Sequence, residues 1–246
     1  MATSQDLKAW DMETLGFQLR QGRPVSRADL RALDLRGVSL ADGVFQECEL
    51  SGMNLSATEL TRSTFVDCRM KDLELGAAML RDARFLRCEM QGLCCAGADL
   101  NQVCFVDCRL DSMRGAGLKL DRGVFSGCEM SGADLETSSL TSAVLWRCTL
   151  AGARLGGVRL SQTALSDTDL RTACLTGLSA NACALMKNDL RGMSLGSVSL
   201  NACQLQESLV SGADFSGARL PGCNLMQVQF EGVCMAGLQA PGALLL

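Results

Sequence analysis

The side chains of this chain that could do the most varied chemistry are its 14 cysteines. A thiolate can act as a nucleophile, bind a metal or enter a disulfide, and the spacing of the cysteines bears on which of these is possible. One series recurs every twenty residues, at Cys48, Cys68, Cys88, Cys108, Cys128 and Cys148. A shorter series follows at Cys183, Cys203 and Cys223. This regularity indicates a structural place within a repeat rather than a catalytic or metal site.

The chain lacks the residues on which most other kinds of catalytic site depend. The chain has no His and no Tyr, which removes the commonest general base, the Ser-His-Asp and Cys-His arrangements and most zinc sites. Gly152, Gly156 and Gly157 are not followed by the Lys-Ser/Thr pair of a phosphate-binding loop. Carboxylates occur on a regular outer surface where no cleft is expected. We therefore expect a protein that is not an enzyme and needs no cofactor.

The bulk composition gives no strong charge signal. The 27 acidic and 23 basic residues leave a net charge of -4, and no basic patch suggests direct nucleic-acid binding. No signal peptide is evident at the N-terminus, and no apolar run reaches the 18 or so residues that a membrane span requires. The expectation is a soluble, cytoplasmic protein that does not enter a membrane.

A period of five residues organises the chain. From Leu30 to Met235 every fifth residue is Leu, Phe or Met, and the exceptions are Cys95, Gly115, Ala180 and Val210. We call these positions inward centres. The residue two places earlier is usually small, as Ala133 is before Leu135, and the remaining three positions are mostly polar. Because a unit of five residues buries nothing alone, the units must stack into coils that each contact only their neighbours.

These units resemble a known consensus. Ala28-Asp29-Leu30, Ala98-Asp99-Leu100, Ala133-Asp134-Leu135 and Ala213-Asp214-Phe215 are similar to the A(D/N)LXX motif of the pentapeptide-repeat family. The resemblance extends over roughly residues 26 to 240. It implies an all-β fold, a right-handed quadrilateral β-helix with four units in each coil of twenty residues and about ten coils.

The residues support a coil of twenty independently. One series of phenylalanines has this interval, at Phe45, Phe65, Phe85, Phe105 and Phe125, and each Phe precedes a cysteine of the first series by three residues. We call this series the Phe column. Where an inward centre is small, the residue two places before it is large: Met113 precedes Gly115 and Leu178 precedes Ala180. Close packing tolerates such exchanges when the total volume is kept.

Both ends depart from the repeat. Residues 1–25 lack it, and Leu7, Trp10, Leu15 and Leu19 have the spacing of one helix face, with Ser4 as a possible N-cap and Gly22 as part of a stop signal. Gly16 could divide the segment into two short helices. We predict a helical cap at residues 1–25, the β-helix at 26–240 and an apolar C-terminal tail at 241–246, which could cover the last coil or bury a subunit contact.

The cysteine series fall on the small inward position, where a free thiol behaves as a small buried apolar group. Stacked side chains have parallel Cβ vectors, which disfavours disulfides between coils. The remaining outward cysteines are the candidates for surface reactivity: Cys94, Cys104, Cys174 and Cys234.

Outward charges alternate in sign along the coils. Asp67, Arg87 and Asp107 form one such series, and Glu49, Arg69, Glu89, Arg109 and Glu129 form another. Adjacent strands would place opposite charges side by side. The family resemblance implies a possible role in protecting DNA gyrase from quinolones by mimicking the negative surface of DNA. That role needs a continuous acidic surface. The alternation of charges argues against it, and gyrase protection is kept as an alternative hypothesis.

The most distinctive outward feature is apolar. Residues directly before and after the centres of the Phe column, and of its continuation after Phe125, are expected to point away from the core, and several are large and apolar. The candidate partner-binding residues are Val66, Leu86, Val106, Val124, Val144, Trp146, Met186 and Met226. A contiguous exposed apolar surface usually marks a contact site. The alternative is that loops or the N-terminal helix cover these side chains.

The sequence therefore predicts a non-enzymatic scaffold that binds another protein, or a second copy of itself as a homodimer, with Trp146 and Met186 as anchors. Gyrase protection is the second hypothesis. A third follows from residues 13–15, 22–25, 29–30 and 33–35, which resemble the lead-in of bacterial pentapeptide proteins found beside type VI secretion components. That resemblance implies an adaptor or accessory role for a secreted protein.

Overall fold

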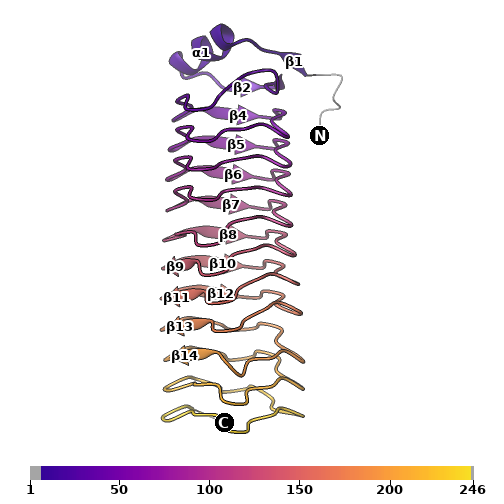
Figure 1. Ribbon diagram of the computed structural model, residues 1–246, viewed down its shortest axis with the longest axis vertical. Helices are drawn as coiled ribbons and strands as arrows, with labels where there is room; N and C mark the ends of the chain where they lie inside the picture. Colours follow the sequence, from indigo (N-terminus) through magenta and orange to yellow (C-terminus); the bar gives the residue numbers. More distant parts are fainter. Residues whose placement is uncertain (1–6, 245–246) are drawn as a thin grey trace.

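The inward centres line the interior of a rod. In the computed structural model, which describes residues 7–244, every inward centre from Leu30 to Leu225 is buried. Strands twenty residues apart pair in parallel, so that Phe45 lies opposite Phe65 and Phe65 opposite Phe85. The chain thus winds as the right-handed quadrilateral β-helix that the family resemblance implies, and Figure 1 shows its coils stacked along one axis.

Two of the four sides carry extended sheets. The larger has eight parallel strands: β2 (Val25–Ser26), β4 (Val44–Gln46), β5 (Thr64–Val66), β6 (Arg84–Leu86), β7 (Cys104–Val106), β8 (Val124–Ser126), β10 (Val144–Trp146) and β12 (Ala164–Ser166). The smaller has four: β9 (Ser139–Thr141), β11 (Arg159–Ser161), β13 (Ser179–Asn181) and β14 (Ser199–Asn201). The outer surface of the eight-stranded sheet is called the Phe-column face below. Elsewhere the coils pair through isolated bridges.

The Phe column is continuous in the core. Adjacent rings from Phe45 to Phe125 stack with centroids 4.7 to 5.2 Å apart. This spacing is close to that between neighbouring strands, about 4.8 Å, so the ladder of the backbone sets the separation of the rings. The prediction that like residues lie above like residues is confirmed.

The cysteine column lies at corners of a particular kind. At most corners the backbone N–H three residues after an inward centre donates to the carbonyl of that centre, as Met53 N does to Leu50 O at 3.2 Å. Within residues 7–244 no such bond follows a centre of the Phe column. Instead the thiol of the next coil reaches that carbonyl, with Cys68 Sγ 3.5 Å from Phe45 O and Cys108 Sγ 3.3 Å from Phe85 O. The thiols therefore act as weak donors as well as small apolar groups.

Gly115 leaves no hole in the core. A Cβ placed on Gly115 would lie 2.5 Å from Leu118 Cδ1 and 3.2 Å from both Cys95 Sγ and Met113 Cε. Large side chains at the small inward positions therefore fill the space that a large centre would occupy. The expected conservation of volume around Gly115 is confirmed, with Leu118 contributing beside Met113.

A helix and a short strand close the N-terminal end. Helix α1 (Met12–Arg20) begins after Asp11, whose carboxylate accepts a hydrogen bond from Thr14 N at 2.7 Å, and it buries Leu15 against the first coil. Strand β1 (Lys8–Ala9) pairs with β3 (Ala28–Asp29) and so covers part of the exposed edge of the first coil.

The cap differs from the expected helix in two respects. The helix starts at Met12, so Leu7 and Trp10 precede it, because the Asp11 side chain supplies the N-terminal cap. Gly16 lies within the helix and does not divide it, since the turns on either side of it are held by helical hydrogen bonds and Leu15 is anchored in the core. The proposed N-cap Ser4 lies outside the described residues.

The described C-terminal residues continue the coil instead of forming a separate tail. Leu244 pairs in parallel with Asn224, and Leu225 N donates to Leu244 O at 2.9 Å. The repeat therefore runs past the expected boundary at residue 240, because Pro241 and Gly242 form an ordinary corner. The inward centres Phe230 and Met235 are only partly covered here. Residues 245–246 of the predicted tail lie outside the described residues.

The packing around Gly115 generates a stability prediction. Gly115→Leu should lower the free energy of unfolding by about 1–3 kcal/mol, because the added side chain must displace Leu118. Adding Leu118→Ala restores the usual large-centre, small-neighbour pattern, so the double variant should be more stable than Gly115→Leu alone. Urea denaturation of the three proteins measures both effects. A Gly115→Leu protein as stable as the parent would mean that the space is not filled.

Candidate protein interaction surface

Outward side chains of the Phe-column face form two rows. The middle residue of each three-residue strand points inward, so the residues on either side of it point outward together. In the first row, Val66 of β5 lies beside Leu86 of β6, and Leu86 lies beside Val106 of β7. All three are half-buried, and Ser126 of β8 ends this run.

The second row is apolar over the next strands. Cys104 of β7 lies beside Val124 of β8, and Val124 lies beside Val144 of β10. The row continues with the small Ala164 of β12. Val144 is 37% exposed, whereas Cys104 and Val124 are half-buried. At β8, where the first row has the polar Ser126, the second row therefore continues the apolar surface with Val124.

Trp146 stands next to the second row, on the same strand as Val144. It is 42% exposed, and the guanidinium carbon of Arg147 lies 4.3 Å from its ring centroid. This cation–π contact holds the indole against the sheet and covers part of one face. Arg147 was not among the predicted site residues; its position directly after an outward Trp is the sequence signal that could have identified it.

The structure brings six of the eight predicted residues into one area. With Cys104, they form what we call the apolar patch: Val66, Leu86, Cys104, Val106, Val124, Val144 and Trp146. Helix α1 does not cover it, because the helix lies over the end of the rod (Figure 1).

Met186 and Met226 lie apart from the apolar patch. Met186 follows the last strand of the sheet, β12, and Ser166 lies between it and Trp146 along the row. Met226 is 42% exposed and lies further still along the rod. The reason is the register: both methionines share the row of Trp146, but polar residues occupy the intervening coils. Met186 and Trp146 therefore do not form a pair of adjacent anchors.

An ion pair and two further cations lie at the edge of the apolar patch. Arg87 Nη2 lies 2.8 Å from Asp67 Oδ2 in the corner that follows β5 and β6. Hydrogen bonding to the Arg87 guanidinium lowers the pKa of the Asp67 carboxyl. Both groups are largely solvated, so this pair contributes little stability. Arg84 of β6, beside Cys104, and Arg147, on Trp146, are further cations at the edge of the patch.

The other alternating series behaves as predicted. Glu49, Arg69, Glu89, Arg109 and Glu129 pair in sequence through parallel bridges. Arg109 Nε lies 2.9 Å from Glu129 Oε2, and Lys71 Nζ from a neighbouring position lies 2.9 Å from Glu89 Oε2. Negative charge on this side is thus interrupted by positive charge at nearly every coil.

The thiols offer little chemistry at the patch. The 14 cysteines are free, and those of the two regular series are buried. Cys174 and Cys234 are exposed, while Cys94 and Cys104 are half-buried. A hydrogen bond with Thr176 lowers the pKa of the Cys174 thiol, which favours its reactive thiolate. Residues 7–244 contain no cluster of three or more His, Cys, Asp or Glu side chains that could hold a metal ion.

Between residues 7 and 244 no helix combines the length and the apolar character needed to cross a bilayer.

Family comparisons match most of the repeat. The model described as "Pentapeptide repeat region" matches residues 38–114. The model described as "Pentapeptide repeats (8 copies)" matches residues 124–154, 138–177, 199–237 and 211–245. No curated protein sequence matches the chain.

Solved structures of pentapeptide-repeat proteins are similar to this chain. The full-length structure of QnrB1, described as a plasmid-mediated fluoroquinolone resistance protein, is 16% identical with a TM-score of 0.59 and covers 83% of this chain and 94% of its own. HetL from the cyanobacterium Nostoc sp. strain PCC 7120, a protein involved in regulating heterocyst differentiation, is 18% identical with a TM-score of 0.42 and covers 95% and 96%. At these identities the similarity concerns the fold alone.

Thiol exposure generates a reactivity prediction. In the native protein, an aromatic disulfide reagent near pH 7 should modify Cys174 first and Cys234 next, because both are exposed and hydrogen bonding lowers the pKa of Cys174. The two buried series should react only after denaturation, when all 14 thiols become available. Peptide mass spectrometry identifies the sites. Rapid native labelling of Cys108 would contradict its burial, and fewer reactive thiols after denaturation without reductant would reveal disulfides.

Proposed function

This chain belongs to the pentapeptide-repeat family, and from that premise we propose that it is a non-enzymatic scaffold that binds another protein through the apolar patch. The observation that carries the proposal is the continuity of outward apolar side chains from β5 to β10, on a sheet whose core is rigidly stacked. A sheet of this kind presents a flat surface that needs no rearrangement before binding. Binding to a preformed surface loses little free energy to the ordering of side chains and loops.

The size of the apolar patch indicates what kind of contact it supports. Five strands at a spacing of about 4.8 Å extend over about 20 Å, and each strand contributes two outward residues about 7 Å apart. Such an area is smaller than the roughly 800 Å² that each partner buries in a standard interface. The patch would therefore form the apolar centre of the interface, and the neutralised corners, including Asp67 and Arg87, would form its polar rim.

A protein suits this surface better than a nucleic acid. The patch itself carries no charge. Asp67 and Arg87 beside it pair with each other, which leaves Arg84 and Arg147 as the cations that border it. Nucleic-acid surfaces bind mainly through several unpaired Lys and Arg side chains on phosphates. The expected partner is a protein with an apolar face of similar width. In a homodimer, that partner is a second copy of this chain.

Protection of DNA gyrase by DNA mimicry is a weaker proposal. It requires an acidic ridge, whereas Arg69 and Arg109 interrupt the acidic series and Arg109 pairs with Glu129 at 2.9 Å. The fold shared with QnrB1 supplies a rod of suitable shape but no partner. A gyrase supercoiling assay with and without a quinolone tests it: protection of supercoiling would favour this role over binding through the patch.

An accessory role beside type VI secretion components remains a prediction from residues 13–35. It is compatible with binding through the apolar patch, because an adaptor also needs a docking face. Identification of the native partner decides whether that partner is a secreted protein.

The binding proposal is tested by matched serine variants. Leu86→Ser, Val106→Ser and Trp146→Ser combined should weaken partner binding at least about tenfold, since central apolar and aromatic side chains dominate interfaces. The fold should persist, because Ser126 and Ser166 occupy equivalent outward positions of the same sheet. The control combines Met79→Ser and Leu209→Ser, which are 47% and 52% exposed and lie outside the patch.

The measurement has two parts. Crosslinking in the native cell identifies the partner, and titration of the purified pair by calorimetry gives the affinity of each variant. Sedimentation of the purified chain alone detects the homodimer and its loss. Equal binding by the patch variant and the control, with circular dichroism unchanged in both, would overturn the assignment of the patch.

A further inference from the structure

The core changes composition partway along the rod. The Phe column ends at Phe125, and its next members are Leu145, Leu165, Leu185 and Leu205. Phenylalanine is larger than leucine, and the other three sides of these later coils are also lined mainly by leucine. Leu178 and Met193 occupy small inward positions here, but Leu178 is matched by the small centre Ala180. The later coils therefore enclose less side-chain volume within a backbone frame of the same size.

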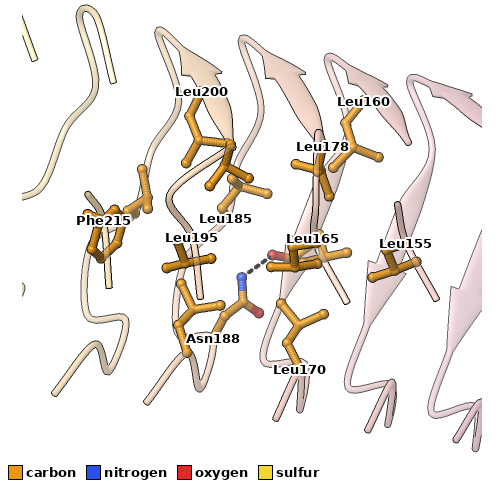
Figure 2. A pocket seen from close by; sticks show the side chains of 14 residues that line it. Leu155, Leu160, Leu165, Leu170, Leu178, Leu185, Asn188, Leu195, Leu200 and Phe215 are labelled. Carbon is orange, nitrogen blue, oxygen red and sulfur yellow. Dashed lines mark hydrogen bonds between the residues drawn. The ribbon is translucent and has the colours of Figure 1, made fainter. Parts of the chain in front are cut away.

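The missing volume is visible as an internal cavity of about 50 Å³. It runs from Leu155 to Phe215 along the axis and is walled by side chains of all four sides, as Figure 2 shows. Leu165 and Leu185 point inward yet each keep 7% of its surface accessible, whereas Leu80 and Leu100 in the earlier coils keep none. The accessible surface of these leucines faces the cavity.

One polar side chain, Asn188, borders the cavity. Its Nδ2 donates to Leu165 O at 2.7 Å, the contact marked by the dashed line in Figure 2, and its Oδ1 accepts from Thr168 N at 3.1 Å. The amide is thus already bonded to the backbone on both of its polar atoms. A buried water molecule needs two to four polar partners, and the leucine walls supply none. A cavity of this kind remains dry although its volume exceeds the 10–15 Å³ or so that one water requires.

We propose that this cavity is a binding site for one small uncharged apolar molecule. The ligand class follows from the walls: dispersion contacts with leucine side chains are available, and groups that require hydrogen bonds would be left unpaired. The void already exists, so a ligand gains these contacts without displacing ordered water or moving the coils. The site lies inside the rod and is independent of the apolar patch, so occupancy of the cavity and binding of a protein partner can be measured separately.

Xenon is a suitable probe, because it is apolar, uncharged and small. Carbon-13 methyl spectra of the full chain are recorded under increasing xenon pressure. The methyl signals of Leu165, Leu185 and Leu195 should shift and saturate, while those of Leu60, Leu80 and Leu100 should stay constant and serve as an internal control. Absence of saturable shifts, or equal shifts in both halves of the rod, would overturn the proposal.

Filling the cavity provides the second test. Leu165→Phe with Leu185→Phe extends the Phe column into the cavity and should abolish the xenon-induced shifts without lowering the midpoint of thermal unfolding. The matched control, Leu80→Phe with Leu100→Phe, places the same added volume in coils where both leucines are fully buried and should lower that midpoint. If the cavity-filling variant is destabilised as the control is, or still responds to xenon, the cavity is not the site. Water signals in contact with these methyl groups would likewise contradict a dry apolar cavity.

Discussion

The structure depends on one constraint, the parallel backbone ladder that places each residue directly above the residue twenty positions earlier. A strand spacing of about 4.8 Å leaves each inward side chain in contact with its counterparts in the adjacent coils. Like residues stack well under this constraint, as the rings from Phe45 to Phe125 do. When one inward side chain is unusually small, a larger side chain in the same or the next coil must fill the space. Leu118 and Met113 do so beside Gly115.

The same ladder explains why a chain with so many cysteines uses them without disulfides. At corners that lack the ordinary backbone bond from the residue three places later, the small inward side chain of the next coil donates a further hydrogen bond to the carbonyl of the centre. Thiols do so through Cys148, and Asn188 and Ser208 do so in later coils. The carbonyl oxygen also accepts in the parallel ladder and has two lone pairs, so this position favours a small side chain that can donate a second, weak bond. Cysteine meets both requirements while remaining largely apolar.

On the outside, the ladder turns a sequence series into a surface. Charges of opposite sign at an interval of twenty become ion pairs, as Asp67 and Arg87 do, and apolar residues at that interval become a continuous patch. Because the underlying strands are held by the stacked core, the patch is a preformed surface. The change from Phe to Leu after Phe125 has the opposite consequence inside, where the unaltered frame encloses an unfilled space.

The period of five and the interval of twenty were readable in the sequence because each inward position is specified by size and polarity alone. They determined the fold, the Phe column, the pairing of Glu49 with Arg69 and the six residues that form most of the apolar patch. Tertiary structure decided what depends on distance and on local geometry. The capping of α1 by Asp11, the contact of Arg147 with Trp146, the separation of Met186 from Trp146 and the cavity beside Leu165 all belong to this second group. The physical reason is that periodicity assigns a side chain to a side of the coil, whereas a contact or a void requires the volumes and positions of all neighbouring side chains at once.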